Sequence, residues 1–102
     1  MIKHIVMWTL KENAHGLGRD ELASKIKADL EALNATIPVI RHIEVGINQL
    51  PGDAACDLCL VSEFANWDDL EAYRTHPDHQ AVVAFVKDAV TARHVVDYVM
   101  EV

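Results

Sequence analysis

The segment Ile2–Lys11 restricts the fold of this chain most, because it reads as a β-strand that is apolar on both sides. It is rich in β-branched and aromatic residues, which is typical of strands. Alternation places one set of side chains on one face, namely Ile2, His4, Val6, Trp8 and Leu10. Ile5 and Met7 make the centre of the opposite face apolar too. Such a strand belongs inside a sheet that is covered on both faces.

The first half of the chain continues with one helix and two further strands. Arg19–Ile37 carries apolar residues at steps of three and four, which predicts an amphipathic helix that Pro38 ends. Val39–Asn48 and Cys56–Ala65 both read as strands. The turn sequence Pro51-Gly52-Asp53 lies between them, so we expect an antiparallel hairpin.

The second half predicts two helices and a last strand. Asn66, with Asp69 three residues later, is typical of a helix N-terminus. Pro77 suits the first position of a second helix, and His94–Val102 reads as the final strand. In the helix that starts after Asn66, the side chains expected to face inward are Trp67, Leu70 and Tyr73.

The predicted order is β-α-β-β-α-β, which is the ferredoxin-like arrangement of an α+β protein. It has a four-stranded antiparallel sheet with both helices on one face. The chain of 102 residues is long enough for one such domain, spanning residues 1–102.

The sheet face without helices is expected to be partly apolar. Apolar residues assigned to it are Ile5, Met7, Cys59, Val61, Val95 and Val99. Polar residues assigned to it are His42, Glu44, Asp57, Glu63 and Asp97. An open face of this composition is unusual for a monomer, so we predict a homodimer that buries it against a second copy.

Charge and hydropathy narrow the possible partners. The net charge of −7 and the absence of any run of Lys or Arg argue against nucleic acid and against an anionic membrane surface. No segment approaches the roughly 20 apolar residues of a membrane span, and no secretory leader is evident. We therefore expect a soluble cytoplasmic protein.

The stretch from Tyr73 to His79 concentrates the chemistry of the chain. It brings one phenol and two imidazoles, those of His76 and His79, close to Pro77, which forces a turn. We predict a pocket between sheet and helices, lined by the following residues: His4, Trp8, Tyr73, His76 and His79.

Several short motifs follow one another over nearly the whole chain: Lys3-His4-Ile5-Val6, Ile37-Pro38, Glu44-Val45-Gly46, Glu63-Phe64, Tyr73-x-x-His76-Pro77-x-His79 and Val96-Asp97-Tyr98. Together they resemble the stress-responsive A/B barrel domain (Dabb) family. The resemblance implies a dimeric α+β barrel in which two ferredoxin-like subunits appose their sheets. Most members have no assigned activity and are named for stress-induced expression.

A plant branch of that family consists of polyketide cyclases, which close a linear poly-β-ketone by an aldol condensation. The resemblance implies that His79 would be the base, that Tyr73 would assist it, and that His4 matches the strand histidine. The cyclases line their pocket with helix aromatics. This chain has aliphatic residues in the comparable stretches, namely Ile26, Leu30 and Val82.

Elementary electrostatics is compatible with that role. A histidine in the first turn of a helix faces the positive end of the dipole, which favours a neutral imidazole that can accept a proton. Tyr73 could donate a hydrogen bond to a developing enolate, and His4 could orient either group. This chemistry requires no cofactor and no metal.

Other interpretations remain open at this stage. His76 could cap a helix while His79 and Tyr73 satisfy each other at the edge of the core. His76 and His79, with His4 or His94, could also be combined into a metal site. Three functions follow: a binder of a small organic ligand, which the sequence favours, a cyclase-like lyase or isomerase with His79 as base and Tyr73 as acid, or a stress-related structural dimer without a ligand site.

Overall fold

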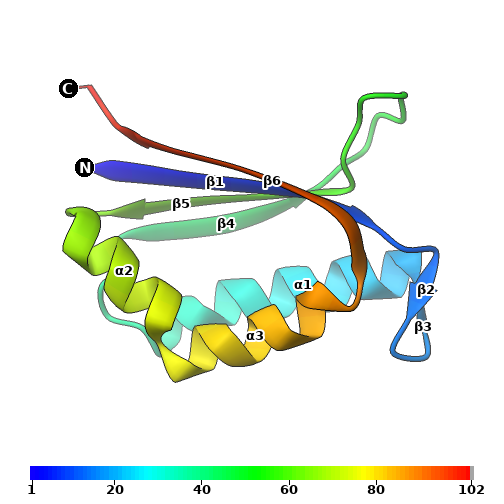
Figure 1. Ribbon diagram of the computed structural model, residues 1–102, viewed down its shortest axis with the longest axis horizontal. Coiled ribbons are helices and arrows are strands. Elements are labelled where there is room, and N and C mark those ends of the chain that lie inside the picture. Colours follow the sequence, from blue (N-terminus) through cyan, green and yellow to red (C-terminus); the bar gives the residue numbers. More distant parts are fainter. Residues whose placement is uncertain (102) are drawn as a thin grey trace.

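Four antiparallel strands form one sheet in the order β4-β5-β1-β6, and the helices all lie on one side of it (Figure 1). The computed structural model describes residues 1–101. The strands of the sheet are β1 (Ile2–Leu10), β4 (His42–Ile47), β5 (Leu58–Phe64) and β6 (Val90–Val99). The helices are α1 (Arg19–Ala32), the 3₁₀ turn η1 (Leu33–Ala35), α2 (Trp67–Thr75) and α3 (Pro77–Lys87). This is the predicted ferredoxin-like α+β fold.

The boundaries differ from the sequence-based expectation at several elements. The predicted loop after β1 contains a small hairpin, formed by β2 (Asn13–Ala14) and β3 (Leu17–Gly18). The last turn of the first helix tightens into η1. The final strand starts at Val90 rather than at His94, because Val90 already pairs with Leu10 across the sheet.

Strand β1, which the sequence predicted to be apolar on both faces, lies in the interior of the sheet. It pairs with β5 on one side and with β6 on the other. Its five inward side chains are all buried, and Val6 is only 1% exposed. On the helix side the core is completed by α1, which buries Leu22, Ile26 and Leu30. The fold is therefore organised around this strand and the helix that packs beneath it.

The register of β6 corrects the predicted assignment of its faces. Directly opposite residues in an antiparallel pair share a face. Asp97 lies opposite His4, and Val95 and Val99 lie opposite the inward residues of β1, so all three face the helices. The β6 side chains on the open face are His94, Val96 and Tyr98, opposite Met7, Ile5 and Lys3.

Both helix N-termini form as predicted. Asn66 accepts a hydrogen bond from the Asp69 backbone N–H over 2.8 Å at the start of α2. Pro77 is the first residue of α3, and the His76 side chain accepts from the Asp78 backbone N–H over 3.1 Å. Trp67 does not face inward as expected: it is the first residue of α2 and is 52% exposed.

Candidate functional site

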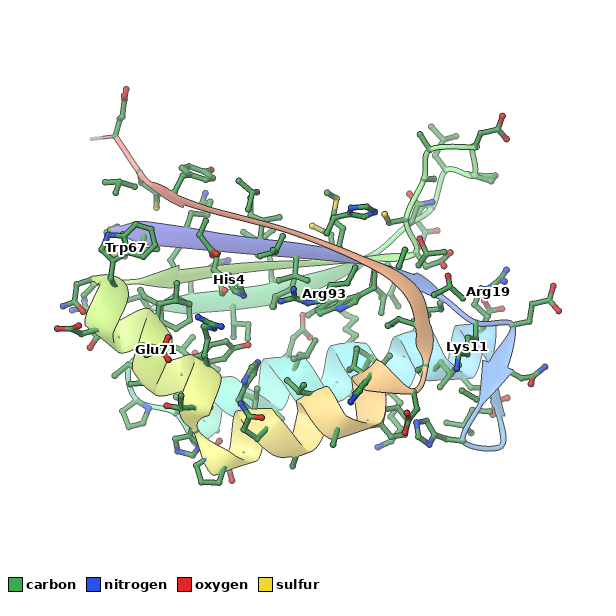
Figure 2. The ribbon with its side chains drawn as sticks, viewed as in Figure 1. His4, Lys11, Arg19, Trp67, Glu71 and Arg93 are labelled. Carbon is green, nitrogen blue, oxygen red and sulfur yellow. The ribbon has the colours of Figure 1, made fainter. Side chains whose placement is uncertain are left out.

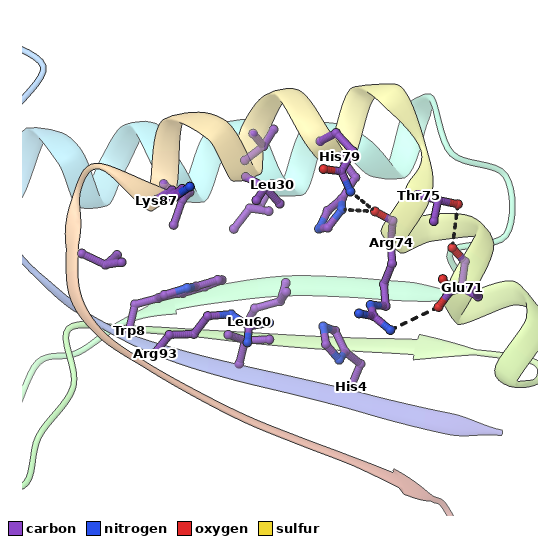
Figure 3. Close-up of a pocket in the computed structure, with 16 residues that line it drawn as sticks. His4, Trp8, Leu30, Leu60, Glu71, Arg74, Thr75, His79, Lys87 and Arg93 are labelled. Carbon is purple, nitrogen blue, oxygen red and sulfur yellow. Dashed lines mark hydrogen bonds and ion pairs between the residues drawn. The ribbon is translucent and has the colours of Figure 1, made fainter.

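A cavity of about 400 Å³ lies between the inner face of the sheet and helices α2 and α3 (Figure 3). The sheet contributes His4, Val6, Trp8, Leu60 and Arg93. The helices contribute Leu30, Glu71, Arg74, Thr75, His79, Gln80, Val82, Val83, Val86 and Lys87, and Val90 lines the cavity from the start of β6. A mostly apolar cavity with a few convergent polar groups is the usual form of a small-molecule site.

His79 is held in one tautomer at the helix side of this cavity. Its Nδ1 lies 3.0 Å from the backbone carbonyl oxygen of Arg74. A carbonyl oxygen only accepts hydrogen bonds, so Nδ1 carries the proton and Nε2 remains the acceptor of the neutral ring. The geometry therefore leaves one ring nitrogen able to take up a proton.

Burial and charge keep the His79 imidazole neutral. Burial lowers the pKa of His79 below its ordinary value, and the nearby charges of His4, Arg74 and Arg93 lower it further. The hydrogen bond to the Arg74 carbonyl acts in the opposite direction and is the weaker effect. At neutral pH His79 is thus a base rather than a cation.

Tyr73 lies behind His79 and does not line the cavity. Its side chain is fully buried. The centroid of its ring lies 4.2 Å from that of His79 and 5.0 Å from that of Phe64. Within residues 1–101 its hydroxyl has no hydrogen-bond partner. Burial raises the pKa of Tyr73 well above its ordinary value, so the phenol stays protonated. It is a neutral donor one layer below the imidazole.

His4 reaches the cavity from β1 and is oriented by a carboxylate. It is only 5% exposed, and its Nδ1 donates to Asp97 on the neighbouring strand β6. This contact fixes the orientation of the ring, with Nε2 directed toward the helix side. The His4 ring lies 6.3 Å from Tyr73 in an edge-on arrangement. Asp97 belongs to the site although the sequence pattern had assigned it to the open face.

The remaining predicted residues divide between the cavity and its surroundings. Trp8 lines the cavity as predicted. His76 does not line it, because its side chain is engaged in capping α3. His94 lies on the other face of the sheet, so the histidines considered for a metal site do not converge. Across residues 1–101 no three His, Cys, Asp or Glu side chains are grouped as metal ligands.

Basic residues that sequence reasoning had not singled out also line the cavity. They are Arg74, Lys87 and Arg93. Arg74 pairs with Glu71 over 3.1 Å, as drawn in Figure 3. Arg74 stands inside the Tyr73–His79 stretch and could have been found there. Arg93 could not, because its orientation depends on the register of β6.

Comparison with known proteins identifies the family. The sequence matches the Stress responsive A/B Barrel Domain family over residues 2–100, and the chain belongs to that family. An uncharacterised protein of Streptomyces coelicolor is 34% identical over 94 residues, which cover 89% of this chain and 92% of that protein.

Solved structures show the same fold. A dimeric ferredoxin-like protein of unknown function from Bacteroides fragilis is 39% identical, with a TM-score of 0.82 over 95% of this chain and 93% of that one. A hydroxynitrile lyase from Passiflora edulis has a TM-score of 0.82 at 19% identity, over 98% of this chain and 93% of that one. The second similarity is one of fold alone. No helix within residues 1–101 is both long enough and apolar enough to cross a membrane.

Proposed function

We propose that this protein binds a small organic molecule in the cavity between the sheet and α3. The observation that carries this proposal is the cavity itself, about 400 Å³ in volume, with apolar walls and two histidines from opposite sides. A volume of this size lies within the usual range of pockets for small organic molecules, roughly 300–1,000 Å³. His4 and His79 would then fix its orientation through their ring nitrogens.

A catalytic role is the second candidate, and the tautomer of His79 favours it. Nε2 of His79 would remove a proton from a carbon or hydroxyl group next to a carbonyl, giving an imidazolium and an enolate or alkoxide. Arg74 and Arg93, which line the cavity, would be the donors available to the developing negative charge, and the neutral Tyr73 behind His79 would help to hold the imidazole in place. A lyase or cyclase reaction of this kind requires no cofactor. The hydroxynitrile lyase with a similar fold is consistent with the proposal, since lyase chemistry occurs in this architecture.

The test is a thermal-shift panel of uncharged phenolic, β-keto and other carbonyl compounds on the wild type, His79→Ala and Tyr73→Phe. A ligand at about 100 times its Kd stabilises the folded state by roughly 2.7 kcal/mol. The proposal predicts stabilisation of the wild type that His79→Ala removes. His15→Ala is the matched control, because it deletes an exposed imidazole outside the cavity lining. Stabilisation that survives in His79→Ala would argue for binding elsewhere, and no stabilisation would favour the structural dimer.

Turnover separates the two candidates. A compound that binds and is converted by the wild type, but only bound by a His79→Gln variant, would establish catalysis. A compound that binds unchanged to the wild type in every assay would limit the function to binding. Tyr73→Phe should leave the fold intact, because the deleted hydroxyl has no partner within residues 1–101.

We propose in addition that the protein is a homodimer through the open face of its sheet. Val96 and Tyr98 are 50% and 43% exposed on that face, and Met7 beside them is 39% exposed. The similar protein from Bacteroides fragilis is described as dimeric. Light scattering should give twice the mass of the chain for the wild type and the monomer mass for Val96→Glu. A monomeric wild type at micromolar concentration would refute this arrangement.

A further inference from the structure

Positive charge gathers at the cavity although the chain as a whole is acidic. The protein has 9 Lys and Arg and a net charge of −7. Arg74, Lys87 and Arg93 all line the cavity, and Glu71 is the acidic residue in its lining. A third of the basic residues therefore surround one small volume. A distribution of this kind creates a local positive potential in an otherwise negative molecule.

These three cations differ in how they are paired. Arg74 is paired with Glu71, 3.1 Å away, in a contact exposed to solvent. Arg93 and Lys87 form no ion pair with any carboxylate of residues 1–101. Asp97, the other carboxylate near the site, is engaged by His4. The cavity thus has two cations without an ion-pair partner within residues 1–101: Arg93 at its sheet wall and Lys87 at the end of α3.

Arg93 is the better placed of the two for a ligand. It lies opposite Trp8 in the register of β6 with β1, on the inner face of the sheet (Figure 2). Figure 3 shows its side chain extending along the sheet wall in the direction of His4. The positive charge of Arg93 also acts on His79 on the opposite wall, where it contributes to lowering the pKa of the imidazole. One guanidinium therefore acts on both walls of the cavity.

A guanidinium at the edge of an apolar cavity matches one ligand chemistry best. Its planar set of N–H donors forms two parallel hydrogen bonds with a carboxylate, an arrangement that the compact ammonium of Lys does not reproduce. The indole of Trp8 and the side chain of Leu60 supply apolar surface beside it. A carboxylate attached to an apolar body would satisfy both features.

We propose that the ligand of this cavity is an organic carboxylate whose carboxylate group is bound by Arg93. The inference rests on the proposed function, since it assumes that the cavity binds a small molecule, and it adds the class of that molecule. Trp8 and Leu60 contact the apolar part of the ligand. His79 lies on the opposite wall, and its Nε2 accepts a proton from a bound ligand that has an acidic one.

Calorimetric titration with phenylacetate and phenylacetamide tests this assignment, because the two compounds share one skeleton and differ in charge. The wild type should bind phenylacetate more tightly by roughly tenfold to a hundredfold, the range for a charge-assisted hydrogen bond. Arg93→Gln should remove this preference, and Arg93→Lys should restore part of it. Arg19→Gln is the matched control, because Arg19 is an exposed arginine at the start of α1 and does not line the cavity.

Each alternative outcome is informative. Equal binding of the two compounds to the wild type would overturn the carboxylate assignment and leave the proposed binding function intact. A preference for phenylacetate that persists in Arg93→Gln would overturn the role of Arg93. If neither compound binds at millimolar concentration, the inference fails, while stabilisation by uncharged compounds that depends on His79 would still support the proposed function. Arg93 is exposed, so circular dichroism should show an unchanged fold in all variants.

Discussion

Helices α1 and α3 pack on the same sheet, but only one of them fills the space beneath it. In α1 the side chains of Leu22 and Ile26 are completely buried, and Leu30 is 3% exposed. In α3 only Val86 is buried, while Val83 is 39% exposed. The first helix closes the core mainly against β4 and also against β1. The second stands over a cavity with polar groups in its walls.

The difference shows that an apolar stripe predicts a helix but not the tightness of its packing. α3 is held at its two ends instead. His76 caps its N-terminus, and beyond its C-terminus Ala89 is completely buried and accepts a hydrogen bond from the Lys11 backbone N–H over 2.8 Å. The middle of the helix can therefore leave room for a ligand without losing its position.

Truncating one sheet-side side chain in each helix should give the largest difference in the free energy of unfolding between α1 and α3. Ile26→Ala should lower the free energy of unfolding by about 2–5 kcal/mol, because it creates a void in a fully buried region. Val83→Ala should cost less than about 1 kcal/mol, since this side chain is partly in contact with solvent. Urea unfolding of both variants measures the two values. Equal losses would mean that α3 is packed as tightly as α1.

Filling the cavity should separate binding from stability. Val82→Phe adds volume to a half-buried side chain that lines the cavity. We expect it to abolish the ligand-induced thermal shift while changing the free energy of unfolding by less than about 1.5 kcal/mol. The same panel of compounds measures this effect. Undiminished ligand stabilisation in this variant would place the binding site outside the cavity.

Acidification should destabilise the α3 side through His79. Its folded-state pKa is lowered, so the unfolded chain binds the proton more readily than the folded one. The stability that the neutral ring provides is therefore present above about pH 6.5, the ordinary pKa, and is lost as the pH falls through the folded value. The groups acting on it are the cationic Arg74 and Arg93 and the ring of His4.

Unfolding measured between neutral and mildly acidic pH, on the wild type and His79→Gln, reveals this contribution. The wild type should lose stability over that range, and the variant should lose less. A variant with the same pH profile as the wild type would mean that His79 titrates as it does in water.

On the α1 side, Glu31→Gln is expected to give the smallest change in the free energy of unfolding. Its carboxylate accepts hydrogen bonds from the Val45 backbone N–H over 3.0 Å and from the Lys27 ammonium over 2.8 Å. These contacts, that of Lys27 first, lower the pKa of Glu31. Their stabilisation is present above the ordinary pKa and disappears as the pH falls through the folded value. Because the pair remains partly exposed to solvent, Glu31→Gln should cost only about 0.2–1 kcal/mol in urea unfolding at neutral pH, and little in strong acid.

The order of helices and strands was predictable because each element shows its own hydrophobic period. The caps at Asn66 and His76 and the position of His79 in the first turn of α3 also follow from local sequence. The face of each β6 residue did not follow, because it depends on pairing with a strand almost a whole chain away. Asp97 and Arg93 were therefore missed, and the burial of Tyr73 behind His79 could only be seen in three dimensions.

We have proposed that the space under α3 is a ligand site with a neutral His79 in its wall. The most direct measurement is the ¹⁵N NMR spectrum of the histidine side chains during titration with phenylacetate. We expect His79 to start as the Nδ1–H tautomer and its resonances to shift on saturation, while those of His15 stay in place. An initially protonated His79, or resonances that do not respond to the ligand, would contradict this proposal.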